Sequence, residues 1–268
     1  MCGICGCDDH HDHEHEHHHH HEDHDDHHEH LSLETRILAK NDHLAEHNRA
    51  WLAQHRVLAL NLMGAPGSGK TSLLERTIRS FEPASLAVIE GDQATANDAD
   101  RIRAAGGRVI QINTGTGCHL DAGMVAGSLE QLAPAAGSVV VIENVGNLVC
   151  PALFQLGEAR RVVVLSAAEG DDKPVKYPHM FRAADLVLIN KIDLLPHVDF
   201  DVEKAAAHAR ALNPRVLVLP VSARSGEGMD AWCAWLREQS EGLGDGGQGR
   251  IERPAHAGGI EIEPRLAL

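Results

Sequence analysis

The stretch M-G-A-P-G-S-G-K-T-S at residues 63–72 decides the fold class of this 268-residue chain. It fits the phosphate-binding pattern G-x-x-x-x-G-K-[ST], with an apolar run of strand length before it and helical spacing after it. Backbone N–H groups of such a loop point at phosphate oxygens, and the following helix N-terminus adds partial positive charge. Lys70 can reach the β- and γ-phosphates, and Thr71 can ligate Mg²⁺. We expect the phosphates to bind along Gly64, Ala65, Pro66, Gly67, Ser68, Gly69, Lys70, Thr71 and Ser72.

Strand-length apolar runs alternate with helical segments along most of the remaining chain. The predicted strands are residues 57–63, 85–90, 108–112, 138–142, 161–165, 186–189 and 216–221, and a last helix includes residues 230–236. Most of these runs are continuously apolar, as in parallel strands that are covered on both faces. The pattern predicts an α/β fold, a three-layer α/β/α P-loop NTPase with a mostly parallel sheet. We assign residues 57–239 to this domain and residues 240–268, which are rich in glycine, to a flexible C-terminal tail.

The sequence N-K-I-D, with Asn190, Lys191 and Asp193, directly follows the sixth predicted strand. A carboxylate can accept two hydrogen bonds from guanine N1–H and N2–H₂, a donor pair that adenine lacks. The Lys191 stem can lie over the base, and Asn190 can brace the loop. Ser222 and Ala223 follow the seventh strand, where backbone N–H groups can contact guanine O6. These residues predict that the nucleotide is GTP or GDP rather than ATP.

Two acidic residues stand near the ends of strands that neighbour the phosphate loop. Asp92 lies in E-G-D-Q after the second predicted strand, and Glu143 lies in E-N-V-G after the fourth. Either carboxylate can ligate Mg²⁺ directly or through water, and the alternative is a solvated acid at a strand end. We assign Lys70, Thr71, Asp92 and Glu143 to catalysis, with the last three as Mg²⁺ ligands. No water-positioning glutamine or arginine finger is apparent, so slow hydrolysis is expected.

A second metal site is predicted where Cys118, His119 and Cys150 approach the same end of the sheet. Cys118 and His119 follow the third predicted strand, and Cys150 comes seven residues after Glu143. Two thiolates and an imidazole suit Ni²⁺ or Zn²⁺, and a second subunit or water must complete the shell. The alternative is that both cysteines are ordinary buried thiols. Cys233, between two tryptophans, is expected in the core.

The first thirty residues form a low-complexity segment. Cys2, Cys5 and Cys7 are followed by thirteen histidines from His10 to His30, with ten acids and no Lys or Arg. No periodic apolar face exists, so residues 1–30 are expected to be disordered. Thiolate and imidazole suit Ni²⁺, Zn²⁺ and Cu²⁺, so we predict that the cysteines hold one ion tightly and the histidines several loosely. The alternative is an affinity tag or a solvated spacer.

Residues 31–56 are assigned to an N-terminal helix that packs on the domain. Ser32 is a possible N-cap, and the helical pattern runs from residue 31 to residue 55. The apolar residues at roughly helical spacing are Leu33, Ile37, Leu38, Leu44, Trp51 and Leu52. His43, His47 and His55 are expected to be surface residues rather than ligands.

Composition excludes several classes of protein. The net charge is −15, but outside residues 1–30 there are 29 acids against 24 bases, so nucleic-acid binding is not indicated. No run of about 18 apolar residues exists, and the acidic N-terminus does not resemble a signal peptide. We therefore expect a cytoplasmic protein without membrane association. Six cysteines in a reducing compartment are expected to be thiols, metal ligands or core residues.

The motifs together resemble the HypB family of hydrogenase nickel incorporation GTPases. The resemblance rests on G-A-P-G-S-G-K-T, E-G-D, N-T-G-T-G-C-H-L-D-A, E-N-V-G-N-L-V-C-P, K-P-V-K-Y-P and N-K-I-D, and covers about residues 31–239. It implies a GTPase that helps to deliver Ni²⁺ to the large subunit of [NiFe]-hydrogenase, with a HypA-like zinc protein as partner and a GTP-dependent homodimer. It also implies that Cys118, His119 and Cys150 form a metal site at the dimer interface. Cys2, Cys5 and Cys7 match the family's nickel motif C-x-x-C-G-C.

Two other functions remain open on the sequence. The urease accessory GTPases, the UreG family, resemble this chain in fold but carry a Cys-Pro-His metal motif, whereas Cys118 and His119 are adjacent here. A passive nickel or zinc storage protein would need the histidine tract but no hydrolysis. The complete phosphate loop with Lys70 and Thr71, together with Asp92 and Asp193, argues against storage alone.

Overall fold

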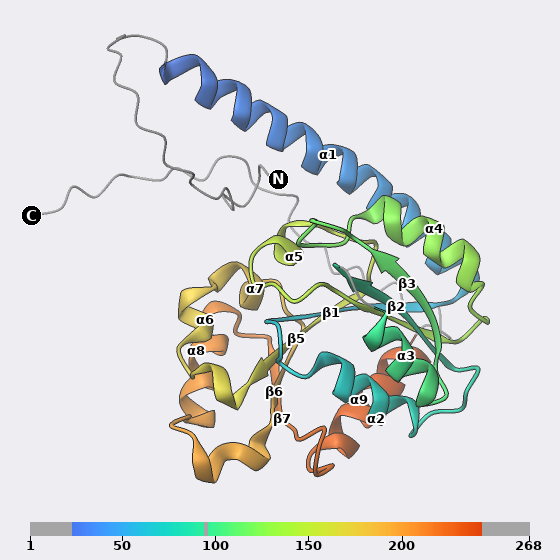
Figure 1. Ribbon diagram of the computed structural model, residues 1–268, viewed down its shortest axis with the longest axis vertical. Coiled ribbons are helices and arrows are strands. Elements are labelled where there is room, and N and C mark those ends of the chain that lie inside the picture. The colour runs from blue at the N-terminus through green and yellow to red at the C-terminus, as the bar shows by residue number, and fades with distance from the viewer. Residues whose placement is uncertain (1–22, 94–95, 243–268) are drawn as a thin grey trace, which may run out of the picture.

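The computed structural model describes residues 23–93 and 96–242, and its centre is a seven-stranded parallel sheet (Figure 1). The strand order is β3-β2-β4-β1-β5-β6-β7, and every neighbouring pair is parallel. The strands are β1 (Leu58–Gly64), β2 (Leu86–Asp92), β3 (Arg108–Asn113), β4 (Val139–Glu143), β5 (Arg160–Ser166), β6 (Leu186–Asn190) and β7 (Leu217–Pro220). All seven predicted strands are therefore present, each within about two residues of its predicted ends.

Helices cover both faces of the sheet, so the predicted three-layer α/β/α architecture is confirmed. One face packs on α2 (Lys70–Ile78), α3 (Asn97–Ala104) and α9 (Met229–Glu241). The other face packs on α4 (Ala122–Leu132), α5 (Cys150–Leu153), α7 (Pro178–Arg182) and α8 (Val202–Leu212), with α6 (Lys173–Lys176) against α8. Two 3₁₀ helices, Ala167–Glu169 and Ile192–His197, complete the described elements.

Successive side chains of β1 point to opposite faces of the sheet and pack against the two helical layers. Leu60 and Leu62 join the cluster under α2 and α9, whereas Ala59 joins the cluster under α4. All seven residues of β1 are buried, because the strand lies at the centre of the sheet. Strands β2, β3 and β4 lie on one side of β1, and β5, β6 and β7 lie on the other. The order in which the chain adds strands to the sheet therefore changes direction beside β1. In open parallel sheets, ligands bind at the carboxyl ends of strands at such a position.

Helix α1 (Asp23–His55) departs from its predicted bounds. The predicted start at residue 31 and the predicted N-cap Ser32 are wrong, because the helix begins eight residues earlier, inside the histidine-rich segment. The prediction of disorder for residues 1–30 is therefore wrong for residues 23–30, and residues 1–22 lie outside the described part. Leu52 is buried as predicted, but Leu33 and Ile37 are exposed. The first half of α1 projects beyond the domain (Figure 1).

Asparagines fasten the second half of α1 to the domain. The Asn48 side-chain amide donates to the backbone oxygens of Ala122 (2.8 Å) and Leu156 (2.9 Å). Asn41 accepts a hydrogen bond from the Ala122 amide and donates one to the Gln155 carbonyl, both 2.9 Å. These bonds satisfy the first backbone amide of α4 and hold α1 in one position over it.

The C-terminal end of the described chain is α9. It runs through the predicted helix at residues 230–236 and continues to Glu241, so the first two residues of the predicted tail are helical. Residues 243–268 lie outside the described part. None of the helices in the described residues has the length and apolarity needed to cross a membrane.

Candidate functional site

The phosphate loop lies between β1 and α2 and depends on glycines at two positions. Gly69 is the N-cap of α2 with φ 93°, and a Cβ there would lie 2.5 Å from the Asn190 side-chain nitrogen. Gly64 has a carbonyl neighbour, Val164 O, 2.4 Å from the position of a Cβ. Any larger residue would therefore displace the loop from the strands around it.

Lys70 lies within this loop, almost completely buried. Its ammonium donates to the carbonyl oxygens of Gly64 and Ala65 at 3.3 Å. Burial lowers the pKa of Lys70, and the Glu143 carboxylate opposes this shift. The loop thus holds the lysine close to the position of the nucleotide phosphates, whose negative charge would offset the cost of burying the ammonium.

Two buried carboxyl groups face each other across β2 and β4. The strand register pairs Glu90 with Glu143, and they are 2% and 4% exposed. The Thr71 hydroxyl donates to Glu143 Oε1 at 2.8 Å. The other oxygen of each carboxyl group, Oε2, is buried and has no hydrogen-bond partner among the described residues.

Burial changes the acidity of both groups. Burial, together with the neighbouring Glu143 carboxylate, raises the pKa of Glu90 to about 8. Burial raises the pKa of Glu143 to about 7, although Lys70 and the Thr71 hydroxyl favour its ionised form. Two unpartnered carboxyl oxygens beside a threonine hydroxyl are the hard oxygen donors that Mg²⁺ binds. The residues present therefore fit a magnesium ion at this position.

A cavity of about 410 Å³ opens above these groups. Besides the phosphate loop, its walls include Asp92, Gln93, Asp98 and Arg101. Arg101 on α3 donates to the Ser72 hydroxyl (3.0 Å) and forms an ion pair with Glu75 on α2 (2.8 Å). The sequence analysis assigned no role to Glu90 or Arg101. Glu90 had a readable signal, since it is an acid at the end of the apolar run S-L-A-V-I-E.

The N-K-I-D sequence lies against the phosphate loop, as its position after β6 predicts. The Asn190 side chain donates to the Ser68 carbonyl at 2.9 Å and accepts from the Ala223 amide at 3.1 Å. Lys191 has a left-handed backbone, φ 65°, and its ammonium donates to the Gly67 carbonyl at 2.6 Å. Asn190 therefore braces the phosphate loop against the loop after β7.

A second hollow, of about 250 Å³, adjoins the first beside these residues. Its walls include Asn190, Lys191, Asp193 and Ala223. The Ser222 hydroxyl donates to Asp193 Oδ1 at 2.6 Å, which leaves the second carboxylate oxygen to meet a ligand. The hollow therefore presents a carboxylate oxygen, the acceptor that the guanine N1–H and N2–H₂ donors need.

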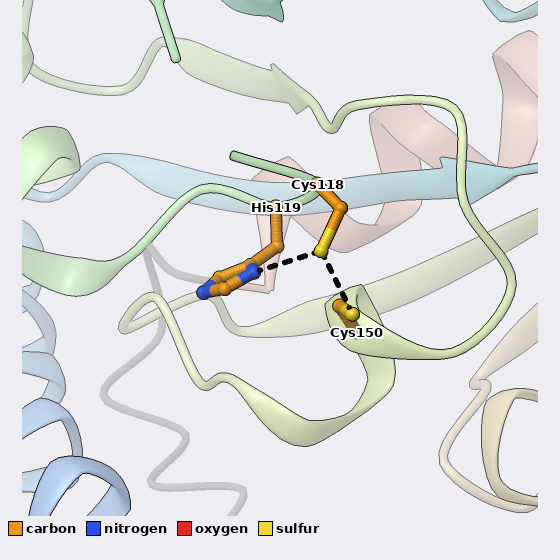
Figure 2. A group of neighbouring side chains, drawn as sticks. All are labelled: Cys118, His119 and Cys150. Atoms are coloured by element: carbon orange, nitrogen blue, oxygen red, sulfur yellow. Dashed lines mark hydrogen bonds between the residues drawn. The ribbon is translucent and has the colours of Figure 1, made fainter. Parts of the chain in front are cut away.

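Cys118, His119 and Cys150 come together at the same end of the sheet (Figure 2). Their ligand atoms all lie within 4.8 Å of one another, and the two sulfur atoms are 2.9 Å apart. The His119 ring stacks on Phe154, with centroids 3.8 Å apart, and burial lowers its pKa, which favours the neutral, ligating form. Cys150 is fully buried at the start of α5, and Cys118 is half-buried.

The other cysteines and the histidine tract lie in three places. Cys233 is buried in the core under α9, as predicted. The predicted ligands Cys2, Cys5, Cys7 and the histidines up to His21 lie outside the described residues. Of the remaining tract, from His24 to His30, the backbone is helical.

Residues 143–150, which we call the connecting loop, join the carboxylates to the thiols. The Asn147 amide donates to the Gly64 carbonyl of the phosphate loop at 3.1 Å. The Asn147 side-chain oxygen accepts from the amide of Cys150 at 3.3 Å. Gly146 lies against Pro66, where a Cβ would come within 2.9 Å of the Pro66 backbone. One short segment therefore touches the nucleotide site and positions a thiol.

Asn144 links the connecting loop to the segment that carries the other two ligands. Its side-chain oxygen accepts from the Leu120 amide at 3.2 Å, one residue after His119. Its side-chain nitrogen donates to Asn61 Oδ1 at 3.2 Å, on the central strand. We call Cys118, His119 and Cys150 the thiol cluster. Both of the segments that carry it are thus fixed to strand ends beside the phosphate loop.

The sequence is similar to those of known nucleotide-binding proteins. Residues 58–220 match the family described as CobW/HypB/UreG, nucleotide-binding domain. The chain is 59% identical over 207 residues to the hydrogenase maturation factor HypB of Rhizobium leguminosarum bv. viciae, covering 77% of this chain and 69% of the relative. It is 56% identical over 210 residues to HypB of Escherichia coli K12, covering 78% and 72%.

Two solved structures are similar in fold and sequence. The crystal structure of HypB from Archaeoglobus fulgidus has a TM-score of 0.71 at 42% identity, covering 75% of this chain and 99% of that one. The crystal structure of HypB from Helicobacter pylori in complex with nickel has a TM-score of 0.71 at 38% identity, covering 75% and 95%. These similarities include the segments that carry the phosphate loop, the paired carboxyl groups and the thiol cluster. The chain therefore belongs to the HypB family of hydrogenase maturation factors.

Proposed function

We propose that this protein is a GTP-hydrolysing nickel metallochaperone that delivers Ni²⁺ for the maturation of [NiFe]-hydrogenase. The observation that carries the proposal is the connecting loop, which contacts the phosphate loop through Asn147 and begins α5 at Cys150. A nucleotide that changes the position of this loop changes the position of a metal-binding thiol. Family membership supports the hydrogenase assignment.

The nucleotide half of the mechanism is assigned to residues around the larger cavity. Lys70 binds the β- and γ-phosphate oxygens, and the backbone N–H groups of the phosphate loop surround them. Thr71, Glu143 and Asp92 would hold Mg²⁺, whose charge would neutralise that of the phosphate oxygens. Asp193 selects guanine through its free carboxylate oxygen. The catalytic roles are thus assigned to Lys70, Thr71, Asp92 and Glu143.

The cargo half is assigned to Cys118, His119 and Cys150, which bind Ni²⁺ or Zn²⁺ through two sulfurs and one nitrogen. Three ligands leave the ion open to a further donor. A second copy of the chain in a GTP-dependent homodimer would supply it. A HypA-like zinc protein and the hydrogenase large subunit are the proposed partners in the cytoplasm. Cys2, Cys5 and Cys7 hold one ion tightly, and the histidine tract forms a metal reservoir.

Coupling follows from the contacts of the connecting loop. The γ-phosphate favours one position of Glu143 and Gly146, and hydrolysis removes that preference. Because Cys150 lies at the other end of the same loop, the two nucleotide states differ in how well the three ligands converge. A difference in nickel affinity between the two states is the coupling free energy.

A Ni²⁺ titration of the full chain tests the proposal. We expect the thiolate-to-nickel absorption band to differ between GDP and a non-hydrolysable GTP analogue, and Cys118→Ala to remove that difference. Lys70→Ala should abolish GTP hydrolysis while leaving nickel binding in place. A band that is insensitive to the nucleotide, with hydrolysis intact, would instead favour storage in the N-terminal segment.

A further inference from the structure

Helix α1 carries two histidines one turn apart, His43 and His47, on a part of the helix that is firmly held. Both side chains are exposed, and their ring centroids are 4.7 Å apart at an interplanar angle of 78°. Their sequence predicts surface residues rather than ligands, and the structure confirms the exposure. Histidines at positions i and i+4 of a helix lie on one face and can bind one metal ion together.

The distance between the rings fits a shared ion. With a metal–nitrogen bond of about 2.1 Å, the ion lies about 3.2 Å from each ring centroid. Bond angles from octahedral to tetrahedral then place the two centroids roughly 4.5–5.2 Å apart. The observed 4.7 Å falls in this interval. Since both rings are exposed, rotation about χ2 can turn one nitrogen of each toward the same point.

The backbone beneath the pair is already ordered. Asn41, Ala45 and Asn48 face the domain and are at most 4% exposed, and both asparagines form hydrogen bonds to Ala122 of α4. Binding an ion therefore costs only side-chain freedom, because the helix turn does not need to form first.

Acidic groups lie around the pair and favour a cation. Glu130 of α4 and His47 line the same hollow of about 190 Å³. Glu46 is exposed on the same turn of α1 as the two histidines. A carboxylate beside a ligating imidazole can accept its second N–H or donate an oxygen to the ion.

We propose that His43 and His47 form a two-imidazole site for a late first-row divalent cation such as Ni²⁺. The site lies on the helix that begins in the histidine-rich segment. Its asparagine anchors contact Ala122, four residues after Cys118. It offers the cargo ion a weak intermediate position between the N-terminal reservoir and the thiol cluster. This inference rests on the proposed function for the identity of the cargo, but not for the existence of the site.

Site-resolved footprinting in the full chain tests the inference. Diethyl pyrocarbonate modifies unligated histidines, and a buffered series of free Ni²⁺ shows at which concentration each histidine is protected. Trypsin separates residues 41–49, which contain His43 and His47, from residues 50–56, which contain only His55. His55 is the internal control, because it is exposed on the same helix but stacks on Trp51 and has no histidine one turn away.

We expect half-protection of His43 and His47 at a free Ni²⁺ concentration at least about tenfold lower than for His55, because two tethered ligands act together. His43→Gln should move the protection of His47 to the His55 value. Equal protection of all three histidines would overturn the inference, as would an unchanged His47 in that variant. The Cys118→Ala variant removes the thiol site but should keep the protection of His43 and His47, which distinguishes failure of the thiol site from failure of the histidine pair. Loss of the His43 and His47 protection in this variant would also count against the inference.

Discussion

Replacing Glu143 by glutamine should stabilise the nucleotide-free protein above neutral pH, although it removes a proposed magnesium ligand. The pKa of Glu143 rises from its ordinary 4.5 to about 7, because the group is buried. Between these values the folded protein keeps a proton that the unfolded chain has released. The wild-type free energy of unfolding therefore falls with pH over this window, by about 1.4 kcal/mol per unit. Glutamine is uncharged and avoids this loss.

The difference between the two proteins follows from the same numbers. Glu143→Gln should be close to neutral near pH 4.5 and more stable than wild type by about 3 kcal/mol at pH 8. Glutamine keeps an oxygen that can accept the Thr71 hydrogen bond, so little packing is lost. The variant also removes a charge that raises the pKa of Glu90, which acts in the same direction.

Urea unfolding of the metal-free, nucleotide-free protein from pH 5 to pH 8 measures this difference. A stability difference that stays constant with pH would refute the reasoning, and so would a variant less stable than wild type at pH 8. Adding Mg²⁺ and GDP at pH 8 provides the second comparison. The ligands should stabilise wild type more than the variant, because only wild type keeps the carboxylate that holds the ion.

Three further substitutions test separate contacts. Asp193→Asn should weaken GTP binding at least about 100-fold, because it removes a charged acceptor for two guanine donors; competition against a fluorescent GDP analogue measures this, and unchanged affinity would contradict the guanine assignment. Asn48→Ala removes two buried hydrogen bonds, to the Ala122 and Leu156 carbonyls, and should cost about 1–3 kcal/mol in urea unfolding; a cost below about 0.5 kcal/mol would mean that α1 is not fastened there. Trp232→Phe removes the 2.8 Å hydrogen bond to the Thr77 hydroxyl and should cost about 1–2 kcal/mol by thermal unfolding, whereas no loss would show that water replaces the indole.

The strands were predictable because each is a short apolar run in a chain with few other apolar runs. In β4, the five residues V-V-V-I-E are all buried, and the predicted strand at residues 138–142 differs from it by one residue at each end. The start of α1 was not predictable in this way. Residues 23–30 contain histidines and acids without any apolar period, so hydrophobic spacing gave no signal for a helix there.

The site residues were predictable where a motif within one segment carries the chemistry. They were not predictable where the site depends on contacts between segments that are distant in the sequence. The phosphate loop and the N-K-I-D sequence are local patterns with a known mechanism. Glu90 is readable as an acid at the end of an apolar run, but its pairing with Glu143 follows only from the β2–β4 register. Arg101 enters the cavity wall through its contacts with Ser72 and Glu75 on another helix. Such contacts between distant segments are set by the fold, and one sequence alone does not reveal them.

Surface loops commonly accept an inserted residue, because little holds them between their ends. The connecting loop is held along its length: by β4 at Glu143, by the bonds of Asn144 to Asn61 and Leu120, by the Gly64 carbonyl at Asn147, and by the start of α5 at Cys150. One added glycine after Gly146 would leave every side chain of both sites unchanged. It would nevertheless break the spacing between the carboxylate and the thiol. The number of residues in this loop is therefore as much a part of the site as their identities.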